Sequence, residues 1–395
     1  MSIKKQIFGW SIYDLANTIF SALFITVYFP LFVVLKKGTA FHVGIAMSLS
    51  MLLAGLLVPF LGALADITKR RKLLLFIFTL LCCVFTFLTG FFNLFFVLLF
   101  GLLANFFYHA GLSIYDSYLI NLSTKENVGK ISGLGIAVGY LGTLLSIAIA
   151  YFVGYLYGFE TNLGIKIIFI LTALFFFSLS LITFYYLKES GIKIEKIHLK
   201  KAFNNVIYTI KSTKKFKFLW LFLLSSFLFV DGASTAIIFI YLYARDQLGL
   251  TIFQFLPIYL LMAIAAGVGA MFFGYIADKW GHKKTLLYVL FSWIIIILIL
   301  YFKTNFITFI IVGTLGGALL GAVWTITRPI LIDLAPKEKI AELFGYLGLT
   351  EKFSGVIGPF LFGYTATSFG FKPALLIVVG LFLLGAFVLS FVKAR

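Results

Sequence analysis

The stretch Gly62-Ala-Leu-Ala-Asp66-Ile-Thr-Lys-Arg-Arg-Lys72 recurs in the second half of the chain as Gly274-Tyr-Ile-Ala-Asp278-Lys-Trp-Gly-His-Lys-Lys284. Each copy follows a long apolar run and ends in a cluster of basic side chains. The glycine allows two helices to approach closely, and the aspartate at the end of a helix needs a cation or a helix N-terminus nearby. Basic residues that only set topology would explain the lysines but not the recurring aspartate. The repeated loop therefore predicts a chain built from two similar halves.

The composition excludes an ordinary soluble protein. Of the 395 residues, 62% are apolar and 12% are charged, whereas a soluble domain has about 25% charged residues. A transmembrane helix needs about 20 predominantly apolar residues. Twelve stretches of the chain meet this requirement, and each is expected to span the membrane. They are residues 8–35, 41–65, 73–92, 94–121, 131–157, 165–187, 217–244, 251–277, 285–302, 305–333, 340–368 and 373–392.

The net charge of +18 indicates how the chain is oriented. Twelve spans place both termini on one side of the membrane, and that side carries 24 of the 32 Lys and Arg residues, against six on the other side. Because basic residues accumulate in cytoplasmic loops, we expect a multi-pass protein of the cell membrane with both termini in the cytoplasm. The excess of positive charge then needs no nucleic-acid partner.

Further matches between the halves occur at nearly the same spacing. Asn121-Leu-Ser-Thr-Lys-Glu126 pairs with Asp333-Leu-Ala-Pro-Lys-Glu338, and Asp14-Leu-Ala-Asn-Thr18 resembles Asp231-Gly-Ala-Ser-Thr235. Transporters made of two such halves bind substrate near the middle of the membrane and rock one half against the other. The predicted domains are an N-terminal six-helix bundle over 1–187, a basic cytoplasmic linker over 188–216 and a C-terminal six-helix bundle over 217–395.

The repeated loop resembles the signature loop of the major facilitator superfamily, which lies between spans two and three and has a weaker copy between spans eight and nine. Two further motifs, Trp10-Ser-Ile-Tyr-Asp14-Leu-Ala-Asn17 and Gly129-Lys-Ile-Ser-Gly133-Leu-Gly135-Ile-Ala-Val-Gly139-Tyr-Leu-Gly142, are similar to the Atg22-like (UMF1) branch. The resemblance implies an all-α membrane protein with the major facilitator fold, twelve transmembrane helices in two six-helix pseudo-repeats. It also implies transport, with amino-acid efflux as the activity associated with fungal members.

Ionisable side chains inside the spans are the candidates for binding a solute or carrying a proton, because each costs about 2.5–3.5 kcal/mol at the centre of a helix. In span one, Asp14, Asn17, Thr18 and Ser21 share one helical face. Asp231 begins the equivalent stripe in span seven. A buried carboxylate can carry a coupling proton, but a purely structural pairing explains these two aspartates equally well.

Five further ionisable residues are candidates in other spans. His109 and Asp116 share a face of span four, where a proton relay and ordinary helix packing are both open interpretations. Arg328 lies near the cytoplasmic end of span ten and is expected either to reach the interface or to hold an anionic group. Glu351 and Lys352 lie near the middle of span eleven. Because adjacent residues do not face each other, one of them is expected to meet the solute.

The two copies of the signature loop are expected to act in gating. The residues that we assign to this role are Gly62, Asp66, Arg70, Arg71, Gly274, Asp278 and Lys283.

The chain contains no phosphate-binding loop of the G-x-x-x-x-G-K-[ST] type, which disfavours ATP-driven transport. No metal site, cofactor or enzymatic activity is expected. The predicted function is secondary, alternating-access transport of a small solute, with amino-acid efflux and proton coupling as the finer expectation, by a monomer. The alternatives are a lipid or lipophile exporter, and a non-transporting scaffold or receptor that has inherited the fold.

Overall fold

The computed structural model describes residues 2–68, 70–123, 128–188, 217–334 and 353–393, together with residues 348 and 350. The regular structure in these residues is helical, and eleven helical runs are long and apolar enough to cross a membrane. The all-α fold with two six-helix pseudo-repeats is therefore confirmed.

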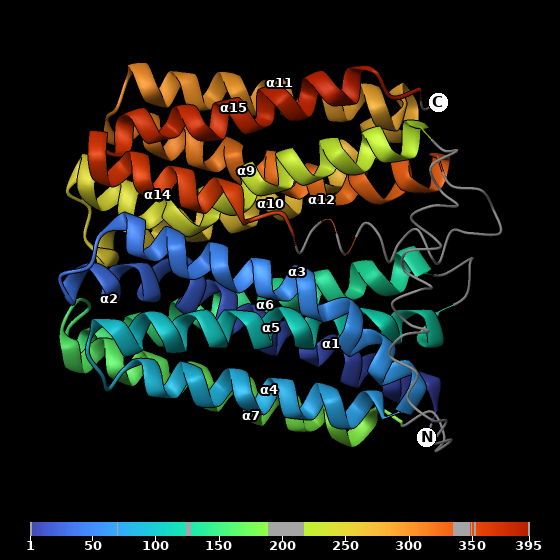
Figure 1. Cartoon of the computed structure of the whole chain (residues 1–395), viewed down its shortest axis with the longest axis horizontal. Coiled ribbons are helices and arrows are strands. Elements are labelled where there is room, and N and C mark those ends of the chain that lie inside the picture. The colour runs from blue at the N-terminus through green and yellow to red at the C-terminus, as the bar shows by residue number, and fades with distance from the viewer. Residues whose placement is uncertain are drawn as a thin grey trace. The chain divides into compact units, whose positions relative to one another are not determined.

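The first half begins with a helical run of 33 residues, Ile3–Leu35. Its middle part is π-helical, and the hydroxyl of Thr26 donates to the carbonyl of Ser21, five residues earlier, at 3.0 Å. π-Helical turns occur frequently at functional sites. The helices of this half are α1 (Ile3–Ile19), η1 (Phe20–Tyr28), α2 (Phe29–Leu35), α3 (Ala40–Thr68), α4 (Arg71–Thr89), α5 (Leu94–Leu122), α6 (Val128–Tyr157) and α7 (Asn162–Tyr186) (Figure 1).

The second half repeats this series with one difference. We expected a continuous helix over 340–368, but the described part of this span is interrupted at Ser354–Val356 before α14 begins. The remainder of the expected span, up to residue 352, lies almost entirely outside the described residues. The helices of this half are α9 (Lys217–Leu248), α10 (Ile252–Trp280), α11 (His282–Phe302), α12 (Phe306–Leu334), α14 (Ile357–Phe369) and α15 (Phe371–Ser390).

The chain divides into two compact units. One comprises Met1–Gly38 and Leu49–Tyr208, and the other comprises Thr39–Ser48 and Thr209–Arg395. The first turns of α3 belong to the second unit because they pack along α14, where the amide of Phe41 donates to the hydroxyl of Thr367 at 3.0 Å. Most of the predicted linker lies outside the described residues, so the domain limits at 187 and 217 stay predictions.

Both units use the same helix pairings. In the first unit α1 packs on α6 and α7, and α4 packs on α5 and α7. In the second unit α9 packs on α14 and α15, and α11 packs on α12 and α15. Figure 1 shows α4 beside α7 and α11 beside α15. The first helix of each half is thus held between the fifth and the sixth.

Short turns join the helices, and side chains satisfy several of the free backbone groups at their ends. Asn93 and Thr161 accept backbone hydrogen bonds at the starts of α5 and α7. Thr251 and Gln254 form a reciprocal capping box at the start of α10. Large apolar side chains such as Phe302, which is 77% exposed, cover the outside. Such a surface suits contact with lipid tails rather than with water.

Candidate functional site

The polar stripe of α1 lies on one face, as the sequence predicts. The side-chain amide of Asn17 donates to Oδ1 of Asp14 at 3.2 Å, and the hydroxyl of Thr18 donates to the backbone carbonyl of Asp14 at 2.7 Å. The hydroxyl of Ser21 continues the stripe by donating to the carbonyl of Thr18 at 3.1 Å. Asn17 is buried and Asp14 is half-buried, so the stripe faces protein rather than lipid.

Three glycines of α6 form the wall opposite this stripe. A Cβ atom at Gly135 would lie 2.8 Å from Oδ2 of Asp14, and one at Gly139 would lie 3.2 Å from Oγ1 of Thr18. At Gly142 it would meet the backbone carbonyl of Leu15. Contacts this short are rare for real Cβ atoms, so each of these positions favours a glycine. The small-residue spacing lets α6 lie directly against the carboxylate of α1.

Aromatic rings enclose Asp14 on another side. The indole of Trp10 donates to the carbonyl of Tyr115 at 3.2 Å, and the two rings are stacked with centroids 4.7 Å apart. Tyr13 also stacks on Tyr115, at 4.9 Å, and its hydroxyl bonds to that of Thr79 at 2.8 Å. These buried rings hold one wall of the site rigidly.

Span four contributes both of its predicted residues, in different environments. His109 is half-buried, and its ring meets the ring of Tyr108 edge-on at 5.0 Å. Asp116 is exposed. Tyr115, the neighbour of Asp116 on α5, stacks on Trp10 and Tyr13 of α1, so α5 and the Asp14 stripe contribute to the same region of the first unit. A carboxylate in such a region can hold a proton or the cationic group of a solute.

Asp231 lies in a different setting from Asp14. Its side chain is 0% exposed. Oδ1 accepts the backbone amide of Gly355 at 2.8 Å, and Oδ2 accepts that of Gly358 at 2.9 Å. Both carboxylate oxygens are thus engaged by the span that α14 continues. Thr235 donates to the carbonyl of Asp231 at 2.7 Å, as Thr18 does to that of Asp14.

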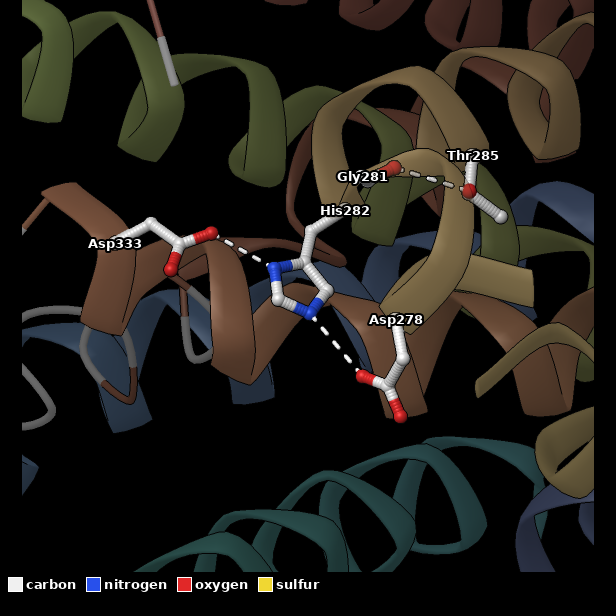
Figure 2. A network of polar contacts seen from close by, with 5 residues as sticks. All are labelled: Asp278, Gly281, His282, Thr285 and Asp333. Atoms are coloured by element: carbon white, nitrogen blue, oxygen red, sulfur yellow. Dashed lines mark hydrogen bonds and ion pairs between the residues drawn. The ribbon is translucent and has the colours of Figure 1, made fainter. Parts of the chain in front are cut away.

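The second signature loop contains a polar clasp. Figure 2 shows His282 between two aspartates, with Nδ1 2.7 Å from Oδ2 of Asp333 and Nε2 3.5 Å from Oδ1 of Asp278. These residues come from the start of α11 and the ends of α12 and α10. Gly281 has φ +92°, a value that favours glycine, and it makes the sharp turn before His282. The clasp joins three helices at one end of the second unit.

Other signature-loop residues contact neighbouring helices. Lys283 donates to the carbonyl of Ser390 at the end of α15, at 2.9 Å, where a cation complements the helix dipole. A Cβ at Gly274 would lie 3.2 Å from Cγ2 of Thr325 on α12. In the first copy, Arg70 is exposed and Arg71 is half-buried.

The remaining predicted residues are either exposed or outside the described part of the chain. Arg328 is exposed on α12, immediately before Pro329. Glu351 and Lys352 lie outside the described residues, and so do the side chains of Gly62 and Asp66, although their backbone belongs to α3. In the part of the chain that the structure describes, no group of three or more His, Cys, Asp or Glu residues could hold a metal ion.

The sequence interpretation missed a very close helix contact in the second unit. A Cβ at Gly317 or at Gly321 of α12 would meet the backbone carbonyls of Met262 or Ala266 of α10, and one at Gly269 would meet that of Ala318. The spacing Gly317-x-x-x-Gly321 was the available signal.

The arrangement can be compared with known proteins. The sequence profile of the Major Facilitator Superfamily matches residues 15–291 and 258–395. The chain is 27% identical to YxiO, an MFS-type transporter of Bacillus subtilis (strain 168), over 98% of this chain and 95% of that protein. It is 26% identical to the multi-drug resistance efflux pump PmrA of Streptococcus pneumoniae serotype 4, over 87% of this chain and 85% of the pump.

Solved structures agree with this assignment at the level of the fold. The crystal structure of the nucleoside transporter NupG superimposes with a TM-score of 0.74, at 16% identity, over 99% of this chain and 98% of that one. With its two pseudo-repeats, its repeated signature loop and a family match along nearly its whole length, the chain belongs to the Major Facilitator Superfamily.

Proposed function

We propose that the protein is a proton-coupled secondary transporter that moves a small organic solute by alternating access, with Asp14 as the carboxylate that carries the coupling proton. The observation that carries this proposal is the setting of Asp14. It is half-buried, Oδ2 lies against Gly135 and Oδ1 accepts a bond from Asn17. A half-buried carboxylate that faces protein can exchange a proton or bind a cationic solute without being exposed to lipid.

The solute class that we place first is amino acids, moved outward. The motifs shared with the Atg22-like branch support this choice, and membership of that branch is part of the proposal. An amino acid carries an ammonium group that the carboxylate of Asp14 can bind. The rings of Trp10 and Tyr115 can in turn contact an apolar side chain of the solute.

Export of lipophilic compounds is the second candidate. Relatives at 26% identity include proteins named as multidrug resistance proteins or efflux pumps, and the wall beside Asp14 is built from aromatic rings. Cationic lipophiles would use the same carboxylate and rings, so both candidates can be tested at one site.

The proposal includes the orientation and the setting of the chain. We place it as a monomer in the cell membrane with both termini in the cytoplasm, because the basic residues lie mostly on the side of the termini. Its partners are then the solute and the bilayer, without nucleic acid, metal or cofactor.

The test begins with thermal unfolding of the purified protein against a panel of amino acids and lipophilic cations, because a ligand that binds only the folded state raises its stability. Compounds that stabilise the protein are then tested in proteoliposomes containing a pH-sensitive dye. We expect solute-dependent proton movement that is lost in Asp14→Asn. Asp246→Asn is the matched control, because Asp246 is an exposed aspartate outside the stripe. Solute flux that ignores the proton gradient would refute coupling, and no flux with either solute class would favour the scaffold alternative.

A further inference from the structure

The two units contain the same three-residue contact, which we call the Asp–Thr/Gly contact. In the first unit it joins Asp14 and Thr18 of α1 to Gly139 of α6. In the second unit it joins Asp231 and Thr235 of α9 to Gly358. In both units a Cβ on the glycine would lie nearest to the threonine hydroxyl and next to atoms of the aspartate. The geometry of this contact therefore belongs to the repeat, and differences within it show where the two halves have diverged.

The fifth helix of each unit is the first difference. In the first unit α6 runs without interruption over Val128–Tyr157. In the second unit the amide of Ser354 still donates to the carbonyl of Thr350 at 2.8 Å, and the chain then turns at Gly355, with φ +91°, before α14 begins at Ile357. A left-handed backbone at this point excludes most side chains other than glycine. The described part of this span is therefore interrupted before α14 begins.

A single residue in the sequence accounts for this difference. Pro359 follows Gly358 in the first turn of α14, whereas the residue that follows the matching Gly139 in α6 is Tyr140. Proline has no amide hydrogen, and its ring collides with the carbonyl four residues earlier, so it is tolerated in the first turn of a helix but not in the interior. Gly355 is the residue four positions before Pro359. The helix has to begin anew between them.

The state of the aspartate is the second difference. A helix that restarts inside a membrane exposes backbone amides that no water can satisfy. Asp231 accepts two of them, from Gly355 and Gly358, and its negative charge also complements the N-terminal end of α14. One turn earlier on α9, the carbonyl of Phe227 accepts the hydroxyl of Ser354 at 3.0 Å. Two successive turns of α9 thus form hydrogen bonds with the residues around the interruption.

From these contacts we infer that Asp231 is a positioning residue for α14 and not a second exchangeable carboxylate. It stabilises the interruption at Ser354–Val356 and fixes where α14 begins. Asp14, which occupies the same place in the repeat, faces an unbroken helix and serves the proton or the solute. This division of roles rests on the proposed transport function only for the role of Asp14.

Hydrogen–deuterium exchange of the full-length protein in lipid nanodiscs tests the role of Asp231 without any solute. In Asp231→Ala, exchange in peptides covering residues 353–362 should rise about tenfold or more, because two amides lose a charged acceptor. Asp231→Asn retains one acceptor oxygen at similar volume and should give an intermediate rise. Peptides covering residues 138–146 of α6 should be unchanged, which shows that the fold persists. Asp14→Asn is the matched control and should leave both regions as in the wild type.

Proton-driven flux in the same variants separates the two proposals. If Asp231→Asn exchanges like the wild type over 353–362 and yet abolishes proton-driven flux, Asp231 is a coupling carboxylate and the inference is wrong. It is also wrong if Asp231→Ala leaves exchange over 353–362 unchanged. If Asp14→Asn has no effect on flux, the proposed coupling role of Asp14 fails, while the exchange result for Asp231 remains valid.

Discussion

Replacing Gly135 by alanine should impair transport more than it impairs stability. The added Cβ would lie 2.8 Å from Oδ2 of Asp14 and 2.7 Å from Cζ3 of Trp10, where ordinary contacts begin at 3.4 Å. Trp10 is held by the bond from its indole nitrogen to Tyr115 and by stacking on the same residue, so α6 has to shift away from Trp10. The carboxylate of Asp14 is displaced as well, by about 0.6 Å if it moves directly away from the new methyl group.

The two energy terms of this substitution partly cancel. Overpacking costs about 1–3 kcal/mol, and replacing a helical glycine by alanine returns about 1 kcal/mol. The net loss of folding free energy is then about 0–2 kcal/mol. Displacing Asp14 acts on function separately, and a loss of about 1.4 kcal/mol in proton or solute binding lowers flux about tenfold at low solute concentration.

Gly133→Ala is the matched control, because it lies on the same helix and a Cβ there has no atom within 4 Å. The assays are thermal unfolding and solute-driven proton movement in proteoliposomes, run on both variants. Gly133→Ala should match the wild type in flux and be equally or slightly more stable. Wild-type flux in Gly135→Ala, or an equal loss in both variants, would refute the idea that α6 sets the position of the carboxylate.

Three further predictions about the packing within the units can be tested by thermal unfolding in detergent. Gly321→Ala should lower stability by on the order of 1–2 kcal/mol, because its Cβ would meet the backbone of α10. Gly313→Ala is the control and should be nearly neutral, because its Cβ meets only the flexible end of the Met262 side chain. Equal losses of stability in the two variants would contradict this prediction. Asn105→Leu removes the buried bond that Asn105 donates to Ser50 at 2.5 Å between α5 and α3 and should cost about 1–2 kcal/mol, so an unchanged melting temperature would count against that bond. His282→Ala removes the imidazole between two aspartates and should cost about 1 kcal/mol, since the site is partly exposed, and a more stable variant would show that the clasp is unfavourable.

Most of the architecture can be predicted from the sequence, because the length and apolar character that a membrane span requires are visible within each short stretch of sequence. Twelve apolar runs, the repeated loop and the face shared by Asp14 and Asn17 all follow from composition and helical periodicity. The glycines at 135, 139 and 142 indicate close helix packing, and α1 proves to be the helix that meets them. The spacing of small residues shows which face of a helix packs closely, but it does not show which other helix packs against that face. The structure was therefore needed to identify the partner.

The break in span eleven was missed for a different reason. The run over 340–368 is long enough for one membrane-spanning helix, and Pro359 in its interior is the local signal against an unbroken one. The amides that the break exposes are satisfied by Asp231, which is 124 residues away from Gly355 in the sequence. The clasp of His282 and Asp333 likewise joins residues 51 apart. Pairings over such distances have no local signal.

Each repeated element keeps its geometry in the two halves but changes its chemistry. Where the second half has His282 and Asp333, the matching positions of the first half hold Arg70 and Asn121. The imidazole that lies between two carboxylates in the second loop is thus replaced by a guanidinium in the first, and the matching partner position holds an amide. The aspartate in the first helix of each half differs as well. In the second half, Asp231 accepts hydrogen bonds from two backbone amides. In the first half, Asp14 is half-buried beside aromatic rings. Two halves that differ in this way cannot perform interchangeable roles, even though their helices pack in the same pattern.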